Sequence, residues 1–172
     1  EEGFIQRPGM QIHYAAVGNG PPLVLLHKLG GWMADWRHIV PALAQKHRVI
    51  ALDSPGHGDS KVEGKPPYLL SLQESAAVLL TALDELNVKK FALVGNSLGG
   101  GIALLMTLDH PGFTQNLVLM APGCVAEREA YFVMPGITKM VSSFGGPDFD
   151  LAEQKRLVSN LVHPDYAPKI PD

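Results

Sequence analysis

The chain has 172 residues, of which 46% are hydrophobic, enough to form the packed core of one ordinary domain. A net charge of −3 and the lack of a basic stripe interleaved with aromatic residues argue against nucleic-acid binding. The longest apolar runs, such as residues 23–26, are too short to span a bilayer. Cys124 is the single cysteine, so no internal disulfide can form, and a cytoplasmic location is predicted with a processed leader left open.

Apolar runs and turn residues predict an alternation of strands and helices. Strands are expected at residues 4–7, 10–17, 23–27, 48–53, 91–94 and 117–120. Helices are expected at residues 36–46, 71–86 and 102–108, with a long loop over residues 54–67. The last four strands are continuously apolar, as in parallel sheets buried on both faces. The predicted fold class is therefore α/β with a mostly parallel sheet.

The character of the sequence changes after Pro122. Residues 1–125 are predicted to form the α/β core, and residues 126–172 a helical cap or lid segment that is incomplete. No further buried strand is visible in this second segment. The C-terminal strands of the fold are therefore expected outside this chain, because a sheet ending at residues 117–120 would leave a long apolar strand on an open edge.

A nucleophile elbow is predicted where the apolar strand at residues 91–94 runs into a helix. Gly95-Asn96-Ser97-Leu98-Gly99 has the Gly-x-Ser-x-Gly pattern of such a turn. The turn holds the serine in a strained backbone conformation, and glycine two residues away on each side removes steric collisions. The N–H groups at the start of the helix can then bind an oxyanion. A glycine-serine turn without chemical function is the alternative, and the flanking strand and helix favour the elbow.

Several motifs in the correct order make the chain resemble the α/β-hydrolase superfamily across residues 4–122. The matching pieces are the first strand pair, residues 27–32, residues 53–60, the elbow, and residues 110–111 before residues 117–122. Within this superfamily the chain is similar to small-molecule esterases, lactonases and carbon–carbon bond hydrolases that carry a helical cap. The Gly-Asn-Ser-Leu-Gly-Gly and Asp-Ser-Pro-Gly forms are most similar to the last of these.

The resemblance implies a set of site residues. Ser97 is the expected nucleophile, and the backbone N–H groups of Leu29 and Leu98 are the expected oxyanion donors. The residues expected to support the surrounding loops are His27, Gly30, Gly95 and Gly99. The candidates for the substrate pocket are Lys28, Asn96 and Trp32.

Lys28 departs from the pattern of the family, in which glycine usually follows the histidine. Its side chain can reach solvent and take no part in binding, as long lysine side chains often do. Alternatively, its ammonium group biases the pocket towards anionic substrates. The first interpretation is preferred.

The base and acid that a catalytic serine needs are not evident in the chain. The resemblance places both after Ser97 in the sequence. Asp109 and His110 do follow it, but at the far end of the helix that begins at the elbow, about 18 Å away at about 1.5 Å per residue. Glu127, Glu129 and His163 are weaker candidates in the cap segment. The remaining C-terminal portion of the same enzyme is therefore expected to supply the Asp or Glu and the His.

The predicted function is a serine hydrolase that acts on a small carboxylic ester or lactone through an acyl-enzyme at Ser97. Serine at this position argues against the haloalkane dehalogenases and epoxide hydrolases of the superfamily, where relatives use aspartate. No cofactor and no metal site is predicted. The alternatives are a carbon–carbon bond hydrolase of the meta-cleavage type and a catalytically silent, ligand-binding protein of the same fold.

Overall fold

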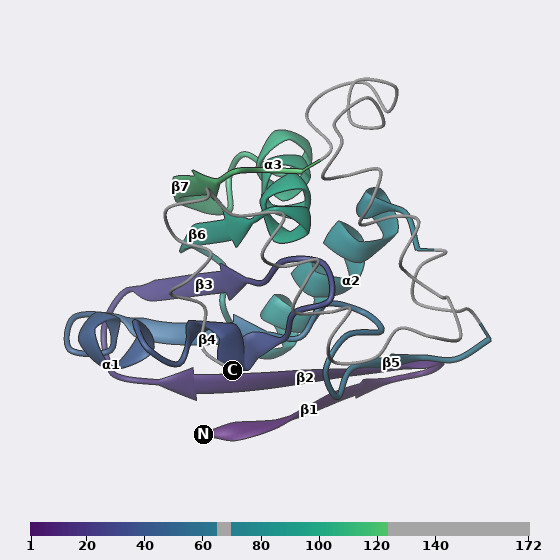
Figure 1. Cartoon of the computed structure of the whole chain (residues 1–172), viewed down its shortest axis with the longest axis horizontal. Helices are drawn as coiled ribbons and strands as arrows, with labels where there is room; N and C mark the ends of the chain where they lie inside the picture. Colours follow the sequence, from purple (N-terminus) through teal and green to yellow (C-terminus); the bar gives the residue numbers. More distant parts are fainter. Residues whose placement is uncertain (65–69, 124–172) are drawn as a thin grey trace, which may run out of the picture. The chain divides into compact units, whose positions relative to one another are not determined.

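A computed structural model describes residues 1–64 and 70–123 of the chain. Seven strands form one sheet in the order β1-β2-β4-β3-β6-β7, and β5 also pairs with β2 (Figure 1). The strands are β1 (Glu2–Arg7), β2 (Met10–Val17), β3 (Pro22–Leu26), β4 (Arg48–Leu52), β5 (Lys61–Val62), β6 (Phe91–Asn96) and β7 (Thr114–Met120). β4, β3, β6 and β7 are parallel to their neighbours in this series, which confirms the predicted mostly parallel α/β sheet.

An antiparallel extension lies beside β4. β1 and β2 form a hairpin around Gly9, whose φ of 75° is the left-handed conformation that glycine adopts readily. β2 then pairs antiparallel with β4 and, further along, with β5. The prediction of an uninterrupted loop over residues 54–67 was therefore wrong at residues 61–62, where a strand too short to leave a pattern pairs with β2.

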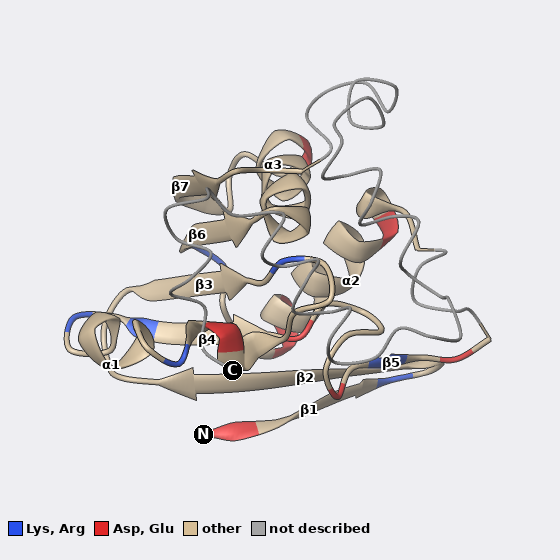
Figure 2. Cartoon of the chain, viewed as in Figure 1, with Lys and Arg blue, Asp and Glu red and all other residues tan. Residues whose placement is uncertain are grey.

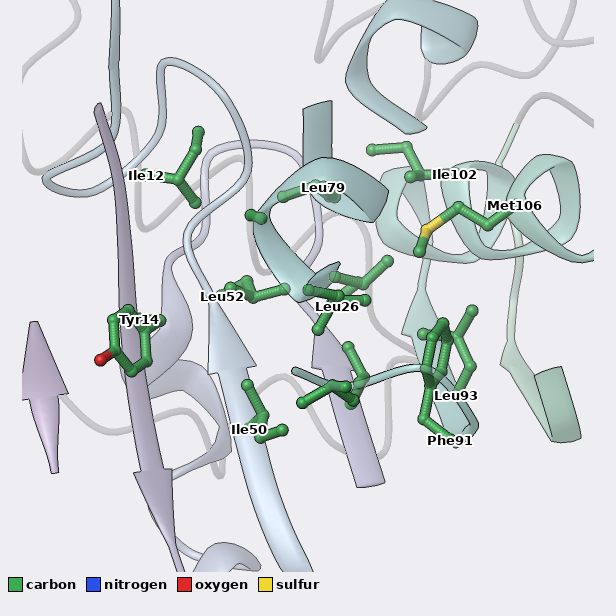
Figure 3. Packing of buried hydrophobic residues seen from close by; sticks show 14 of the residues in the cluster. Ile12, Tyr14, Leu26, Ile50, Leu52, Leu79, Phe91, Leu93, Ile102 and Met106 are labelled. Atoms are coloured by element: carbon green, nitrogen blue, oxygen red, sulfur yellow. The ribbon is translucent and has the colours of Figure 1, made fainter. Parts of the chain in front are cut away.

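Helices cover both faces of the sheet. On one face, the large cluster in Figure 3 packs sheet residues such as Leu26, Leu52 and Leu93 against Leu79 of α2 (Leu72–Glu85) and Met106 of α3 (Leu98–Asp109). A smaller cluster on the other face packs Trp36 and the partly buried residues of α1 (Val40–Leu43) against β3 and β4. Burial on both faces explains why these strands have continuous apolar sequences.

The start of α2 was predicted correctly. Ser71 is its N-cap, the Ser71 hydroxyl accepts the Glu74 N–H, and the Glu74 carboxylate accepts the Ser71 N–H. This reciprocal capping box satisfies two of the backbone donors that a helix start leaves unpaired.

The single helix predicted over residues 36–46 was wrong. A short 3-10 helix, η1 (Met33–Trp36), is followed by a turn and then by the four residues of α1. Pro41 lies in the first turn of α1, where its missing N–H does no harm. A helix running from residue 36 would place the same proline in its interior, where the ring collides with the carbonyl of Arg37.

β7 was expected to be buried, and this too was wrong. From residue 116 to residue 120 its side chains alternate between exposed and partly buried, with Val118 51% and Met120 45% exposed. Within the described residues β7 pairs only with β6, so it forms an edge of the sheet. An apolar strand therefore lies on an open edge, as the sequence predicted for a sheet that ends at these residues.

Charged residues of both signs are interspersed over several elements (Figure 2). Among the described helices, none has the length and apolar character needed to cross a membrane. The predicted cap segment, residues 126–172, lies outside the described residues.

Candidate active site

Ser97 occupies a sharp turn between β6 and α3. Its φ of 51° and ψ of −113° are uncommon for a residue other than glycine. Three hydrogen bonds hold this conformation: the Ser97 N–H donates to the Met120 carbonyl at 3.0 Å, and the Ser97 carbonyl accepts the N–H groups of Gly101 at 3.0 Å and Gly123 at 2.7 Å. The end of β7 and the start of α3 therefore both fix the turn.

The two glycines of the pattern are required by close backbone approaches. A Cβ atom on Gly95 would lie 2.3 Å from the Gly99 carbonyl oxygen. A Cβ atom on Gly99 would lie 2.4 Å from the Leu26 carbonyl oxygen and 2.6 Å from that of His27. Non-bonded atoms do not approach so closely, so any larger residue at either position would displace α3 from β6 or from β3.

Three polar groups around the turn are unpaired within the described part of the chain. Ser97 makes no capping hydrogen bond with its side chain, so its Oγ is available as a nucleophile. Leu98 is the first residue of α3, and its N–H is one of the donors that a helix start leaves without a partner inside the helix. The Leu29 N–H likewise has no partner among residues 1–64 and 70–123.

The Leu29 donor belongs to the segment of residues 27–33, which we call the His27 loop. This loop follows β3 directly, and the His27 carbonyl accepts the Gly99 N–H at 3.1 Å. The hydrogen bond joins the start of the loop to the first turn of α3. It therefore brings the two predicted oxyanion donors to the same end of the sheet.

The His27 imidazole is fully buried and braces the loop. Its Nδ1–H donates to the Lys28 carbonyl at 2.7 Å, and its Nε2 accepts the Ser54 N–H at 2.9 Å. Because a carbonyl can only accept and a backbone N–H can only donate, these partners define the neutral Nδ1–H tautomer. Burial lowers the pKa of His27, and the hydrogen bond to the Lys28 carbonyl opposes that shift.

The turn within the loop depends on Gly30. The φ of Gly30 is 67°, in the left-handed region, and the Gly31 N–H donates to the Lys28 carbonyl at 3.0 Å to close the turn. A Cβ atom on Gly30 would meet nothing within 4 Å, so the requirement for glycine here is conformational rather than steric.

The three pocket candidates differ in their surroundings. The Lys28 Nζ donates to Asp35 Oδ2 at 2.9 Å, with 51% of the lysine side chain exposed, so its charge is partly neutralised. Trp32 is 47% exposed at the start of η1. Asn96 is the last residue of β6, is partly buried, and directly precedes Ser97.

No described residue after Ser97 can serve as its base. Asp109 ends α3 and His110 is its C-cap, at the opposite end of the helix from Ser97. The other candidates for acid or base, Glu127, Glu129 and His163, and the lone Cys124 lie outside the described residues. Within residues 1–64 and 70–123, no group of three His, Cys, Asp or Glu side chains could hold a metal ion.

The sequence interpretation missed Asp53. This residue follows β4, is fully buried, and accepts a hydrogen bond from the backbone of the His27 loop. One signal was available in the sequence: an aspartate directly after a continuously apolar strand is rarely buried unless it is paired.

Comparisons with known proteins agree with this arrangement. The alpha/beta hydrolase fold family model matches residues 21–146. A 2-hydroxymuconate semialdehyde hydrolase from Pseudomonas sp. (strain CF600) is 34% identical over 169 residues, covering 92% of this chain and 56% of that protein. A pimeloyl-(acyl-carrier protein) methyl ester esterase from Aeromonas hydrophila is 37% identical over 134 residues, covering 77% of this chain and 49% of that protein.

A solved structure is also similar to this chain in fold. A meta-cleavage product hydrolase from Pseudomonas fluorescens IP01 matches with a TM-score of 0.77 and 26% identity, covering 97% of this chain and 61% of that chain. The chain spans about half the length of the curated relatives it matches, 56% of one and 49% of the other.

Proposed function

The chain belongs to the α/β-hydrolase family, and we propose that it carries the nucleophile half of a serine hydrolase active site. Ser97 is the nucleophile, and the Leu29 and Leu98 N–H groups form the oxyanion hole. The observation that carries the proposal is the strained Ser97 turn, whose hydroxyl and the adjacent Leu98 N–H have no hydrogen-bond partner among residues 1–64 and 70–123.

The chemistry follows from these groups. The Ser97 Oγ attacks the substrate carbonyl carbon and loses its proton to a general base, while the carbonyl electrons move onto the oxygen. The two backbone N–H groups donate to that oxyanion, and removal of one such donor typically slows a reaction by about 10²- to 10³-fold. Collapse of the tetrahedral intermediate breaks the bond to the leaving group, which takes the proton from the base. Water then hydrolyses the acyl-enzyme by the same steps.

We further propose that the base and the acid come from sequence beyond this chain. The chain covers only about half of its curated relatives, and the described titratable residues after Ser97 lie at the wrong end of α3. The same C-terminal portion would add strands alongside β7, whose apolar side chains are half exposed. Residues 126–172 would form part of a cap over the substrate.

The proposed substrate is a small carboxylic ester or lactone. The Aeromonas esterase, 37% identical to this chain over 134 residues, supports ester chemistry at such a site. A second candidate is hydrolysis of a carbon–carbon bond in a ring-fission product. It is favoured by the semialdehyde hydrolase that matches 92% of this chain and by the structural match to a meta-cleavage product hydrolase.

A fluorophosphonate probe tests the proposal on the full-length gene product. We expect covalent labelling that maps to the peptide containing Ser97 and that Ser97→Ala abolishes. Absence of labelling in the correctly folded wild-type protein would contradict the serine mechanism and favour a silent ligand-binding protein. In a second assay, faster turnover of a coloured ring-fission substrate than of p-nitrophenyl esters would assign the carbon–carbon bond class instead of the ester class.

A further inference from the structure

A buried carboxylate contacts the far end of the His27 loop. Asp53 is 0% exposed, and its Oδ1 accepts the Met33 N–H at 2.6 Å. Its Oδ2 accepts the Asp59 N–H at 3.0 Å. An isolated buried carboxylate is strongly unfavourable, so these donors and the carboxylate hold one another in place.

The near end of the same loop is attached to the adjacent residue. The His27 imidazole, which begins the loop, accepts the N–H of Ser54 at 2.9 Å. Asp53 and Ser54 are consecutive, so one dipeptide at the end of β4 contacts the loop at residue 27 and at residue 33. Leu29, the predicted oxyanion donor, lies between these two points of attachment.

The carboxylate has little freedom to move. His13 of β2, itself 4% exposed, places its Nδ1 3.0 Å from Asp53 Oδ2, and the His13 carbonyl accepts the Asp53 N–H at 3.0 Å. A Cβ atom on Gly58 would lie 2.1 Å from the same Oδ2, so the backbone of the loop after β4 packs directly against the carboxylate. The sheet and this second loop therefore fix the orientation of Asp53.

We propose that Asp53 is a positioning residue for the oxyanion hole, acting through its hydrogen bond to the Met33 N–H. This inference rests on the proposed function, in which Leu29 and Leu98 stabilise the oxyanion. The His27 carbonyl ties one end of the loop to Gly99, beside Leu98, and Asp53 fixes the other end. Loss of the second attachment frees Leu29 to move, and a displacement of about 1 Å in such a site can slow catalysis about 100-fold.

Met33 allows a selective test because it is the first residue of η1. Proline is well suited to the first position of a helix, and the preceding Trp32 is already extended, as a residue before proline prefers. Met33→Pro therefore suits the local backbone and removes the N–H that Asp53 accepts, and its Cδ, which takes the place of the hydrogen, pushes the carboxylate away from the loop. Met33→Ala is the matched control, since it shortens the side chain but keeps the N–H.

The experiment measures fluorophosphonate labelling of Ser97 in the full-length gene product. We expect Met33→Pro to lower the maximal labelling rate about 10- to 100-fold, with the probe concentration for half-maximal rate changed less than about twofold. Met33→Ala should stay within about threefold of wild type in both quantities. In protein labelled with ¹⁵N-leucine, the Leu29 amide resonance should move in Met33→Pro and stay in place in Met33→Ala. Asp53→Ala, which removes both acceptor oxygens, should reproduce the Met33→Pro result and provides the test if the proline variant does not fold.

Three outcomes would overturn the proposal. A wild-type maximal rate in Met33→Pro or Asp53→Ala would show that the attachment does not position the Leu29 N–H. An equal loss in Met33→Ala would assign the effect to the side chain rather than the N–H. If the folded wild-type protein never labels at Ser97, the proposed function fails first and the positioning role fails with it, which separates the two failures.

Discussion

β6 and β7 are neighbouring parallel strands with apolar sequences, yet their environments differ. β6 pairs with β3 on one side and with β7 on the other, and its side chains alternate between buried and partly buried. β7 pairs only with β6 within residues 1–64 and 70–123, and Val118 and Met120 are half exposed. An apolar composition therefore does not by itself decide whether a strand is buried. Burial depends on which neighbouring elements cover its side chains.

The contrast extends to the proposed active site. The end of β6 carries Ser97, whose backbone is fixed by hydrogen bonds to the end of β7 and to α3. The backbone of the proposed nucleophile is therefore fixed by hydrogen bonds among the described residues. The other edge of β7 has no partner among the described residues. The strands that would supply the acid and base are proposed to lie along this edge.

The elbow glycines give the largest expected effect. Gly99→Ala places a Cβ about 2.4 Å from the Leu26 carbonyl, so the backbone must shift. We expect a loss of about 3 kcal/mol or more in the free energy of unfolding and no detectable labelling of Ser97. Gly112→Ala, where a Cβ meets nothing within 4 Å, is the control and should change stability by less than about 0.5 kcal/mol. Equal losses of stability in Gly99→Ala and Gly112→Ala, measured by denaturant melts, would contradict the conclusion that steric contacts require glycine in the elbow.

Truncation of one side chain in each strand tests the burial difference directly. Leu93→Ala in β6 removes a fully buried side chain and should lower the free energy of unfolding by about 2–5 kcal/mol. Val118→Ala in β7 should cost less than about 0.5 kcal/mol in the 172-residue chain. In a longer gene product in which an added strand and its helix cover this face of β7, the same change should cost about 1–2 kcal/mol. An equally small cost in both proteins would argue against such a strand.

The buried imidazole of His27 should make the stability of the protein depend on pH. Its pKa lies below the usual 6.5 because of burial, so the unfolded chain takes up a proton more readily than the folded one. The stabilisation that neutral, buried His27 contributes is therefore present above about pH 6.5. It is lost as the pH falls from that value towards the lower pKa of His27 in the folded protein.

The measurement is thermal melting between about pH 8 and pH 5. We expect His27→Asn to be less stable at neutral pH and to show a shallower decline on acidification than wild type. His38→Asn, at an exposed position outside the loop, should leave the wild-type slope unchanged. If the melting temperature of His27→Asn falls with pH as steeply as that of wild type, His27 does not contribute to the loss of stability in acid.

The smallest effect is expected at Lys28. Its ammonium group is paired with Asp35 and half exposed, and exposed pairs of this kind contribute about 0–1 kcal/mol. We expect Lys28→Ala to change the ratio of kcat/KM for carboxylate-bearing and neutral esters less than about threefold in the full-length protein. A change of about tenfold or more would instead support a role in anion binding.

Much of the fold was predictable because the signals are local. Continuous apolar runs located the central strands, and the capping box located the start of α2 within one residue. The helix expected over residues 36–46 was wrong because the prediction did not take the position of Pro41 into account. Residues 61–62 form a strand only because β2 lies beside them.

The sequence by itself determined the elbow, because the strained serine and its two glycines lie within five consecutive residues and need no distant partner to be recognised. Tertiary structure decided the rest of the site. Asp53 interacts with Met33, Asp59 and His13, which are distant from one another in the sequence and meet only through the order of strands in the sheet. The exposure of Val118 and Met120 was likewise decided by tertiary structure, because they point to the face of β7 opposite Leu117 and Leu119, and an apolar pattern specifies that a surface should be buried but not which neighbour buries it.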